Sequence, residues 1–158
     1  MNPTIETLLD RVQKPGRYAG GELNSVVKDR DAVRIRFAFC FPDLYEVGMS
    51  HLGMKILYGL FNSMEDVWCE RVFAPDTDME ALMREESVPL FGIESGDPVR
   101  EFDFIGFTLQ YEMSFTAVLN MLDLAGLPVR AEERGDTGPI VVAGGPCACN
   151  PEPLADFI

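Results

Sequence analysis

The feature that most constrains this chain is a repeated alternation between short apolar runs and longer segments with helical spacing. Apolar runs typical of strands occur at residues 33–41, 67–73, 90–93, 104–109 and 140–143. Apolar residues recur at helical spacing in residues 50–62, 76–86 and 114–125. Strands that alternate with helices in this way form parallel βαβ units. We therefore expect an α/β fold of the Rossmann-like, doubly wound class, with a mostly parallel sheet and helices on both faces.

The first 30 residues stand apart from this alternation. Asn2 and Pro3 are typical of a helix start, apolar residues then recur at helical spacing, and Pro15 ends the pattern. Residues 24–28 favour a small strand. We expect residues 1–30 to form a helix and a short extended segment that pack on a Rossmann-like domain at residues 31–158. A further helix is expected to begin after Pro151 and Pro153.

The charge and the cysteines limit the classes of partner. With 26 acidic and 13 basic residues, the net charge is −13, which repels a phosphate backbone, so nucleic acid is not an expected partner. No apolar run approaches the roughly 18 residues that cross a membrane, and no leader resembles a signal peptide. The four cysteines show no disulfide framework. We expect a cytoplasmic protein with free thiols and no membrane partner.

Ligands of open parallel sheets bind beyond the carboxyl ends of the strands. Three loops are expected there, at residues 41–53, 108–115 and 144–151. Gly144 and Gly145 either let the backbone approach a flat ligand or make a tight strand-to-helix turn, and the spacing leaves both interpretations open. Neither a Walker phosphate loop nor a G-x-G-x-x-G fingerprint occurs. Thr108 and Gln110 stand at a strand end, where polar groups could bind a ligand or simply begin a helix.

His51 is the only histidine. It could act with Asp43 as a hydrolytic or metal pair, or it could be a capping or packing residue. The absence of a second nearby ligand favours the structural role. Cys147 and Cys149 form a C-x-C pair, which is too small for a zinc site.

Three stretches together resemble a known family: FCFPDLYEVGMSHLGMKILYGLFN, DFIGFTLQYEMSFTAVLNMLDLAG and IVVAGGPCACNPEPLADFI. They are similar to the N-terminal region of uncharacterised radical S-adenosylmethionine (SAM) proteins, which begins with a cobalamin-binding-like Rossmann domain, and the likeness covers residues 18–158. The resemblance implies that a radical SAM barrel follows, with a 4Fe-4S cluster on a C-x-x-x-C-x-x-C motif. Because this chain lacks that motif, we expect the cluster, SAM and the radical chemistry only in a full-length enzyme, and we expect the chain to be truncated before the barrel.

The resemblance also implies where cobalamin would bind. The expected residues lie below the corrin ring, at the nucleotide tail and at the Gly-Gly turn, and they are His51, Leu52, Gly53, Thr108, Gln110, Gly144, Gly145 and Pro146. Met49 and Met54 replace the aspartate and glycine of the D-x-H-x-x-G signature, so cobalamin is expected without histidine ligation. The domain would position this corrinoid against the barrel. The alternative is a non-catalytic docking domain that keeps the fold and binds no cobalamin.

Overall fold

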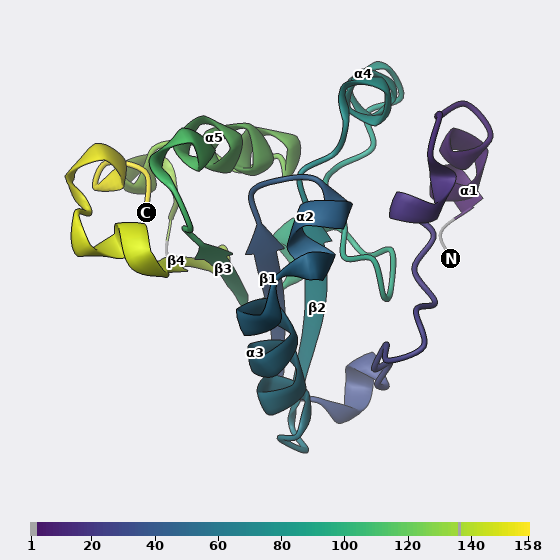
Figure 1. Ribbon diagram of the computed structural model, residues 1–158, viewed down its shortest axis with the longest axis horizontal. Helices are drawn as coiled ribbons and strands as arrows, with labels where there is room; N and C mark the ends of the chain where they lie inside the picture. The colour runs from purple at the N-terminus through teal and green to yellow at the C-terminus, as the bar shows by residue number, and fades with distance from the viewer. Residues whose placement is uncertain (1–2, 136) are drawn as a thin grey trace.

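The computed structural model describes residues 3–135 and 137–158, and its strands and helices alternate along the chain (Figure 1). The strands are β1 (Ile35–Phe41), β2 (Val67–Phe73), β3 (Phe104–Thr108) and β4 (Ile140–Gly144). The helices are α1 (Pro3–Leu9), α2 (Tyr45–Ser50), α3 (Leu52–Asn62), α4 (Thr77–Glu85) and α5 (Phe115–Leu124). Short 3-10 turns occur in several of the connections.

The four strands form one sheet in the order β2-β1-β3-β4, and every neighbouring pair is parallel. The chain moves from β1 to β2 on one side and then crosses back to β3 on the other side of β1. The strand order therefore reverses between β1 and β3, which is the topological switch point of a doubly wound sheet. This arrangement confirms the α/β fold class expected from the alternating pattern.

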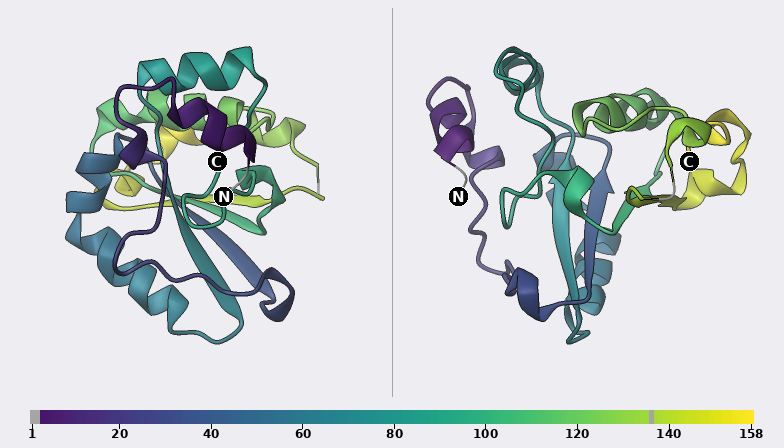
Figure 2. Two further views of the ribbon diagram at one scale, coloured as in Figure 1. Left: turned by 90° about the vertical axis from the view of Figure 1, so that its right-hand side faces the viewer. Right: turned by 180° about the vertical axis from the view of Figure 1, so that it is seen from behind.

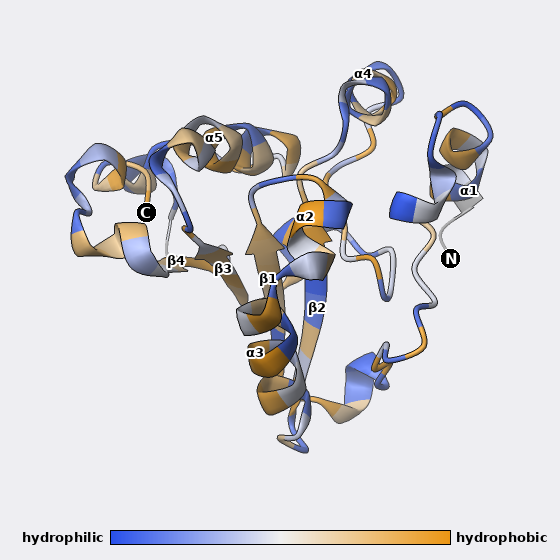
Figure 3. Cartoon of the chain, viewed as in Figure 1, coloured by the Kyte–Doolittle hydropathy of each residue, from blue (hydrophilic) through white to orange (hydrophobic). Residues whose placement is uncertain are grey.

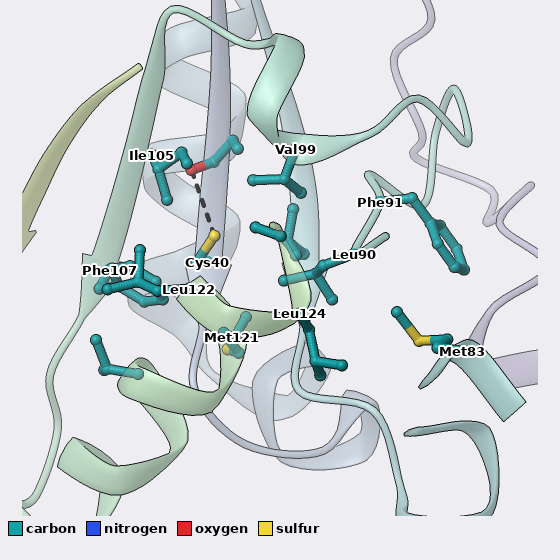
Figure 4. Packing of buried hydrophobic residues seen from close by; sticks show 14 of the residues in the cluster. Cys40, Met83, Leu90, Phe91, Val99, Ile105, Phe107, Met121, Leu122 and Leu124 are labelled. Atoms are coloured by element: carbon teal, nitrogen blue, oxygen red, sulfur yellow. Dashed lines mark hydrogen bonds between the residues drawn. The ribbon is translucent and has the colours of Figure 1, made fainter. Parts of the chain in front are cut away.

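Alternate residues of β1 supply two apolar layers. Ala38 and Cys40 belong to the larger core cluster, together with residues of α1, α4 and α5. Phe39 and Phe41 belong to a smaller cluster with residues of α3. Helix α3 thus lies on one side of the sheet, and α1, α4 and α5 lie on the other (Figure 2). Figure 4 shows the larger cluster from close by, where strand and helix side chains interleave.

The expected strand at residues 90–93 is wrong. This segment makes only an isolated antiparallel bridge, between Phe91 and Pro98. It instead covers the outer edge of β2: Ile93 N–H donates to Arg71 O at 3.0 Å, and Arg71 N–H donates to Glu94 Oε2 at 2.8 Å. The run is apolar because Leu90, Phe91 and Ile93 are buried, and a run of that length does not distinguish a strand from a buried loop.

The segment around residues 24–28 also forms no strand. Two side chains bind its backbone in place of a neighbouring strand: Tyr58 Oη accepts from Val26 N–H at 2.7 Å, and Trp68 Nε1–H donates to Val26 O at 3.0 Å. Helix α1 ends at Leu9, before the expected stop at Pro15, although Ile5 and Leu8 are buried in the larger core.

Two further boundaries differ from the sequence pattern. Residues 45–50, expected as loop, form the short helix α2. The helix expected after Pro151 is only a 3-10 turn at Glu152–Leu154, followed by a turn. Pro151 and Pro153 have no backbone N–H, so the hydrogen bonds of a regular helix cannot all form in this segment.

Candidate carboxyl-edge site

The loops after β1 and β3 meet across the switch point. Tyr111 Oη–H donates to Asp43 Oδ2, and this hydrogen bond raises the pKa of the Tyr111 hydroxyl. Asp43 Oδ1 also accepts from Leu44 N–H at 2.7 Å, which fixes the start of the loop after β1. The sheet therefore brings together two of the three loops that the sequence placed at this edge.

The ends of β3 and β4 lie side by side. Thr108 pairs in register with Gly144, and Leu109 N–H donates to Gly144 O at 2.7 Å. Gln110 Nε2–H donates to Thr108 Oγ1 at 2.6 Å. Thr108 is buried, at 8% exposure, whereas Gly144 is exposed to solvent. Thr108, Gln110 and Gly144 therefore lie close together, with Gly144 at the surface.

The two glycines of the Gly-Gly turn have different roles. Gly145 has φ +101°, and a Cβ atom there would lie 2.6 Å from Leu109 O. It is required for the tight turn, in which Cys147 N–H donates to Leu109 O at 3.2 Å. A Cβ on Gly144 would meet no atom within 4 Å. The turn interpretation holds for Gly145, whereas Gly144 leaves open space beside the strand end. Pro146 begins the 3-10 turn that follows.

His51 caps helix α3. Its Nδ1 accepts from Met54 N–H at 3.1 Å, so the neutral ring carries its proton on Nε2. The ring centroid lies 5.4 Å from that of Phe41, and a Cβ on Gly53 would come within 2.8 Å of His51 Cε1. Leu52 follows as the first helical residue and is 68% exposed. These contacts agree with the capping and packing role that the sequence left open.

The proposed pair of His51 and Asp43 has no support in the contacts of either residue. Asp43 bonds Tyr111 and Leu44, whereas His51 bonds Met54. Among residues 3–135 and 137–158, no group of three or more His, Cys, Asp or Glu residues is placed to hold a metal ion. All four cysteines are free thiols.

Among residues 3–135 and 137–158, no helix covers β3 and β4 on the α3 side, where the Phe37 ring lies over Gly106 of β3 and β4 is left exposed. On β3 and β4, Ile105, Phe107, Val141 and Ala143 point into the larger core, so the alternate residues point to the opposite face. Of these, Ile140 and Val142 are 56% and 39% exposed. Helix α3 covers β1 and β2 on this side. Its residues Met54, Tyr58 and Phe61 pack against three phenylalanines of β1, which are Phe37, Phe39 and Phe41.

The flank of α3 beside this bare face is also apolar. Lys55 and Gly59 face the N-terminal segment, and helical spacing places Gly53, Leu57 and Leu60 on the opposite flank. Leu57 and Leu60 are 40% and 53% exposed, and Figure 3 shows hydrophobic residues along this helix. We name this surface the apolar corner: the flank of α3 with the exposed face of β4. Gly144 is the last residue of β4 and so lies at the carboxyl-edge end of this surface.

The all-parallel sheet and its switch point define a doubly wound α/β domain, a class in which ligands ordinarily bind at the carboxyl ends of the strands. Residues 53–158 match the family described as radical SAM proteins, N-terminal, and the chain belongs to that family. No curated protein and no solved structure matches the chain. Within the described residues, no helix has the length and apolar character needed to cross a membrane.

Proposed function

We propose that this domain holds a corrinoid for the radical SAM domain of the same protein. Family membership supports the pairing with a radical SAM domain. The observation that carries the corrinoid proposal is the open space beside Gly144, where a Cβ would meet no atom within 4 Å. Gly144 pairs with Thr108 and lies at the end of the apolar corner. When bound, a corrinoid supplies a cobalt centre for methyl or radical transfer, and the protein supplies its orientation.

The residues at this edge fit a flat ligand with a polar tail. Gly144 exposes backbone without a side chain, and the exposed side chains of Val142 and Ile140 make the adjoining surface of β4 apolar. Thr108 and Gln110 place a hydroxyl and an amide at the strand end. The absence of a side chain at Gly53 leaves room for the His51 ring, since a Cβ there would come within 2.8 Å of His51 Cε1. A nucleotide tail could therefore lie along the strands with its polar groups toward the loop.

Cobalt ligation by this chain is not part of the proposal. His51 is the only histidine, its Nδ1 already accepts a backbone N–H, and its neutral ring carries the proton on Nε2. Ligation would require His51 to give up either the helix cap or that proton. We therefore propose binding without a protein ligand to cobalt, as the departure from the D-x-H-x-x-G signature predicts.

Membership in this family implies a 4Fe-4S cluster and SAM in the full-length protein. The four cysteines of this chain do not have the C-x-x-x-C-x-x-C spacing, and Cys40 and Cys69 are buried within the sheet, where burial raises their thiol pKa values. We propose that the cluster and SAM bind in a separate barrel, against which this domain packs. The acidic charge and free thiols support a cytoplasmic protein without a nucleic-acid partner.

Titration of the 158-residue chain with hydroxocobalamin tests the proposal. We expect a saturable shift of the visible absorption bands and co-elution of the corrinoid with the protein in gel filtration. An unchanged spectrum of free cobalamin at high protein concentration, with no co-elution, would contradict corrinoid binding.

A docking domain without cobalamin is the second candidate, and the exposed apolar residues favour it. Leu52, Ile56 and Leu60 of α3 are more than half exposed, at 68%, 59% and 53%, and a contiguous apolar surface usually marks an interaction site. In this case, the separate radical SAM barrel would protect Leu52, Ile56 and Leu60 from labelling by a photo-reactive diazirine, and hydroxocobalamin would leave that labelling unchanged.

A further inference from the structure

A second hollow lies on the other flank of α3, away from the apolar corner. It has a volume of about 400 Å³, is open to solvent on one side and lies between residues 22–26, α2, α3 and β2. Its apolar lining comes from Val26, Met49, Met54 and Tyr58, and Leu23, which is 99% exposed, stands at its rim. Small-molecule sites are typically mostly apolar cavities of roughly 300–1,000 Å³ with a few placed polar groups. This cavity has both the size and the lining of such a site.

Arg71 supplies the buried polar group of this cavity. Its side chain is only 7% exposed. Its Nε–H donates to Glu94 Oε1 at 2.6 Å, and its Nη2 donates to Glu22 Oε2 at 2.9 Å and to Ser25 Oγ at 2.8 Å. The guanidinium carbon also lies 4.6 Å from the centre of the Tyr58 ring. The positive charge of Arg71 and two of its three side-chain nitrogens, Nε and Nη2, therefore already have partners.

The third nitrogen, Nη1, has a weaker partner. It donates to Met49 Sδ at 3.3 Å, and Met49 also lines the cavity. A thioether sulfur is a weak acceptor, whereas a buried cationic donor is best satisfied by oxygen. Arg71 thus presents a donor to the cavity for which a ligand oxygen would be a better acceptor than the sulfur it now has.

We propose that this cavity binds a small apolar molecule bearing a carbonyl or carboxylate oxygen, which accepts from Arg71 Nη1 in place of the Met49 sulfur. The apolar body packs on the two methionines and Val26. Two charged residues besides Arg71 line the cavity: Glu22, which is already paired with Arg71, and the exposed Lys55, which favours a carboxylate over a cation at the mouth. This inference is independent of corrinoid binding, because it concerns the opposite flank of α3.

The single tryptophan provides a direct readout. Trp68 donates to the carbonyl of Val26, which lines the cavity, so occupancy should change its fluorescence. The probes are octanoate and 2-octanone, with octylammonium as a chain of equal length that lacks an oxygen acceptor. Octanoate and 2-octanone should give saturable changes, and octylammonium should bind at least about tenfold more weakly. Saturation-transfer NMR on the same samples detects any binding that leaves the fluorescence unchanged. Equal binding of all three probes, or no binding by either method, would overturn the proposal.

A variant that fills the cavity makes the test specific. Gly59 lines the cavity in α3, and a Cβ there meets no atom within 4 Å. Gly59→Leu should keep the fold, since leucine favours helix more than glycine does, and should weaken octanoate binding at least about tenfold. Gly138→Leu is the matched control, because its Cβ also points into open space and Gly138 lies outside this cavity. Circular dichroism verifies the fold of both variants, and undiminished octanoate binding by Gly59→Leu would reject the site.

Met49→Leu tests the role of the weak acceptor. The substitution conserves volume and removes the sulfur, so Arg71 Nη1 loses its present partner. Octanoate should then bind at least as tightly as to the unmodified chain, since the ligand oxygen satisfies a donor that is otherwise unpaired. Several-fold weaker binding by a folded Met49→Leu variant would contradict the proposed oxygen contact.

Discussion

At the scale of single residues, Gly145 is the position where backbone conformation decides the structure. Its φ of +101° and the close approach of Leu109 O leave no room for a side chain. We predict that Gly145→Ala lowers the free energy of unfolding by about 2 kcal/mol or more. Gly144→Ala should change it by less than about 0.5 kcal/mol, because a Cβ there meets open space. Urea denaturation of both variants measures the contrast, and equal losses would show that the turn is not constrained as described.

Glu94 is a buried carboxyl group whose titration is coupled to folding. Burial raises its pKa to about 7, although Arg71 partly opposes the shift. Between an unfolded pKa near 4.5 and the folded value, the folded chain binds more protons than the unfolded chain. The stabilisation from Glu94 is therefore fully present below about pH 4.5 and is lost as the pH rises through about 7.

We predict that Glu94→Gln flattens the pH dependence of stability in this window. Its contribution to the change in unfolding free energy between pH 5 and pH 7.5 should be on the order of 2 kcal/mol. Urea denaturation at the two pH values, compared between the unmodified chain and the variant, isolates this group from the other acids. Identical pH slopes for the two proteins would contradict the assignment.

At the scale of elements, the start of α3 depends on a side chain that the sequence singled out for chemistry. His51 Nδ1 satisfies the N–H of Met54 in the first helical turn. We predict that His51→Ala lowers stability by about 1 kcal/mol and that His51→Asn retains most of it, because asparagine is a good N-cap. Thermal unfolding followed by circular dichroism compares the two variants. Equal losses would mean that the ring acts by packing on Phe41 and not by capping.

The sequence predicted the four sheet strands and helices α3, α4 and α5 because their periodic apolar faces are long enough to be distinct. It failed at residues 90–93, where apolar side chains enter the core from a loop. It also missed α2, which is short and ends where α3 begins. Gly48 lets α2 approach the sheet closely, since a Cβ there would lie 2.3 Å from the Phe73 ring, a tertiary contact that no local pattern records.

The candidate site was only partly predictable for the same reason. Thr108 and Gly144 could be placed together because the ends of parallel strands share an edge. The different roles of Gly144 and Gly145 depend on the position of Leu109 in a neighbouring strand end. The buried Arg71 and Glu94 pair was missed. Arg71 stands within a strand pattern, where a charged residue is ordinarily expected on the solvent face, and Glu94 belongs to a turn, where burial leaves no periodic signal.

At the scale of the whole molecule, helices of the described residues cover one face of the sheet, whereas on the other face α3 covers β1 and β2 and β4 is left exposed. Parallel sheets are normally buried on both faces, so the apolar corner is the surface that this fold leaves to be filled. Arg71, Glu94 and the loop around Ile93 protect the opposite edge at β2. Under the proposed function, the corrinoid and the barrel would contact the exposed side of β4, whereas the cavity beside Arg71 lies on the other flank of α3.

The most direct measurement is the dissociation constant of hydroxocobalamin, by equilibrium dialysis, for three proteins: the unmodified chain, Gly144→Leu and Gly138→Leu. Both substitutions place a side chain in open space, so both should preserve the fold. The account predicts that Gly144→Leu binds at least about tenfold more weakly, while Gly138→Leu binds like the unmodified chain. No binding by the unmodified chain, or equal affinities for all three proteins, would contradict corrinoid binding at this edge.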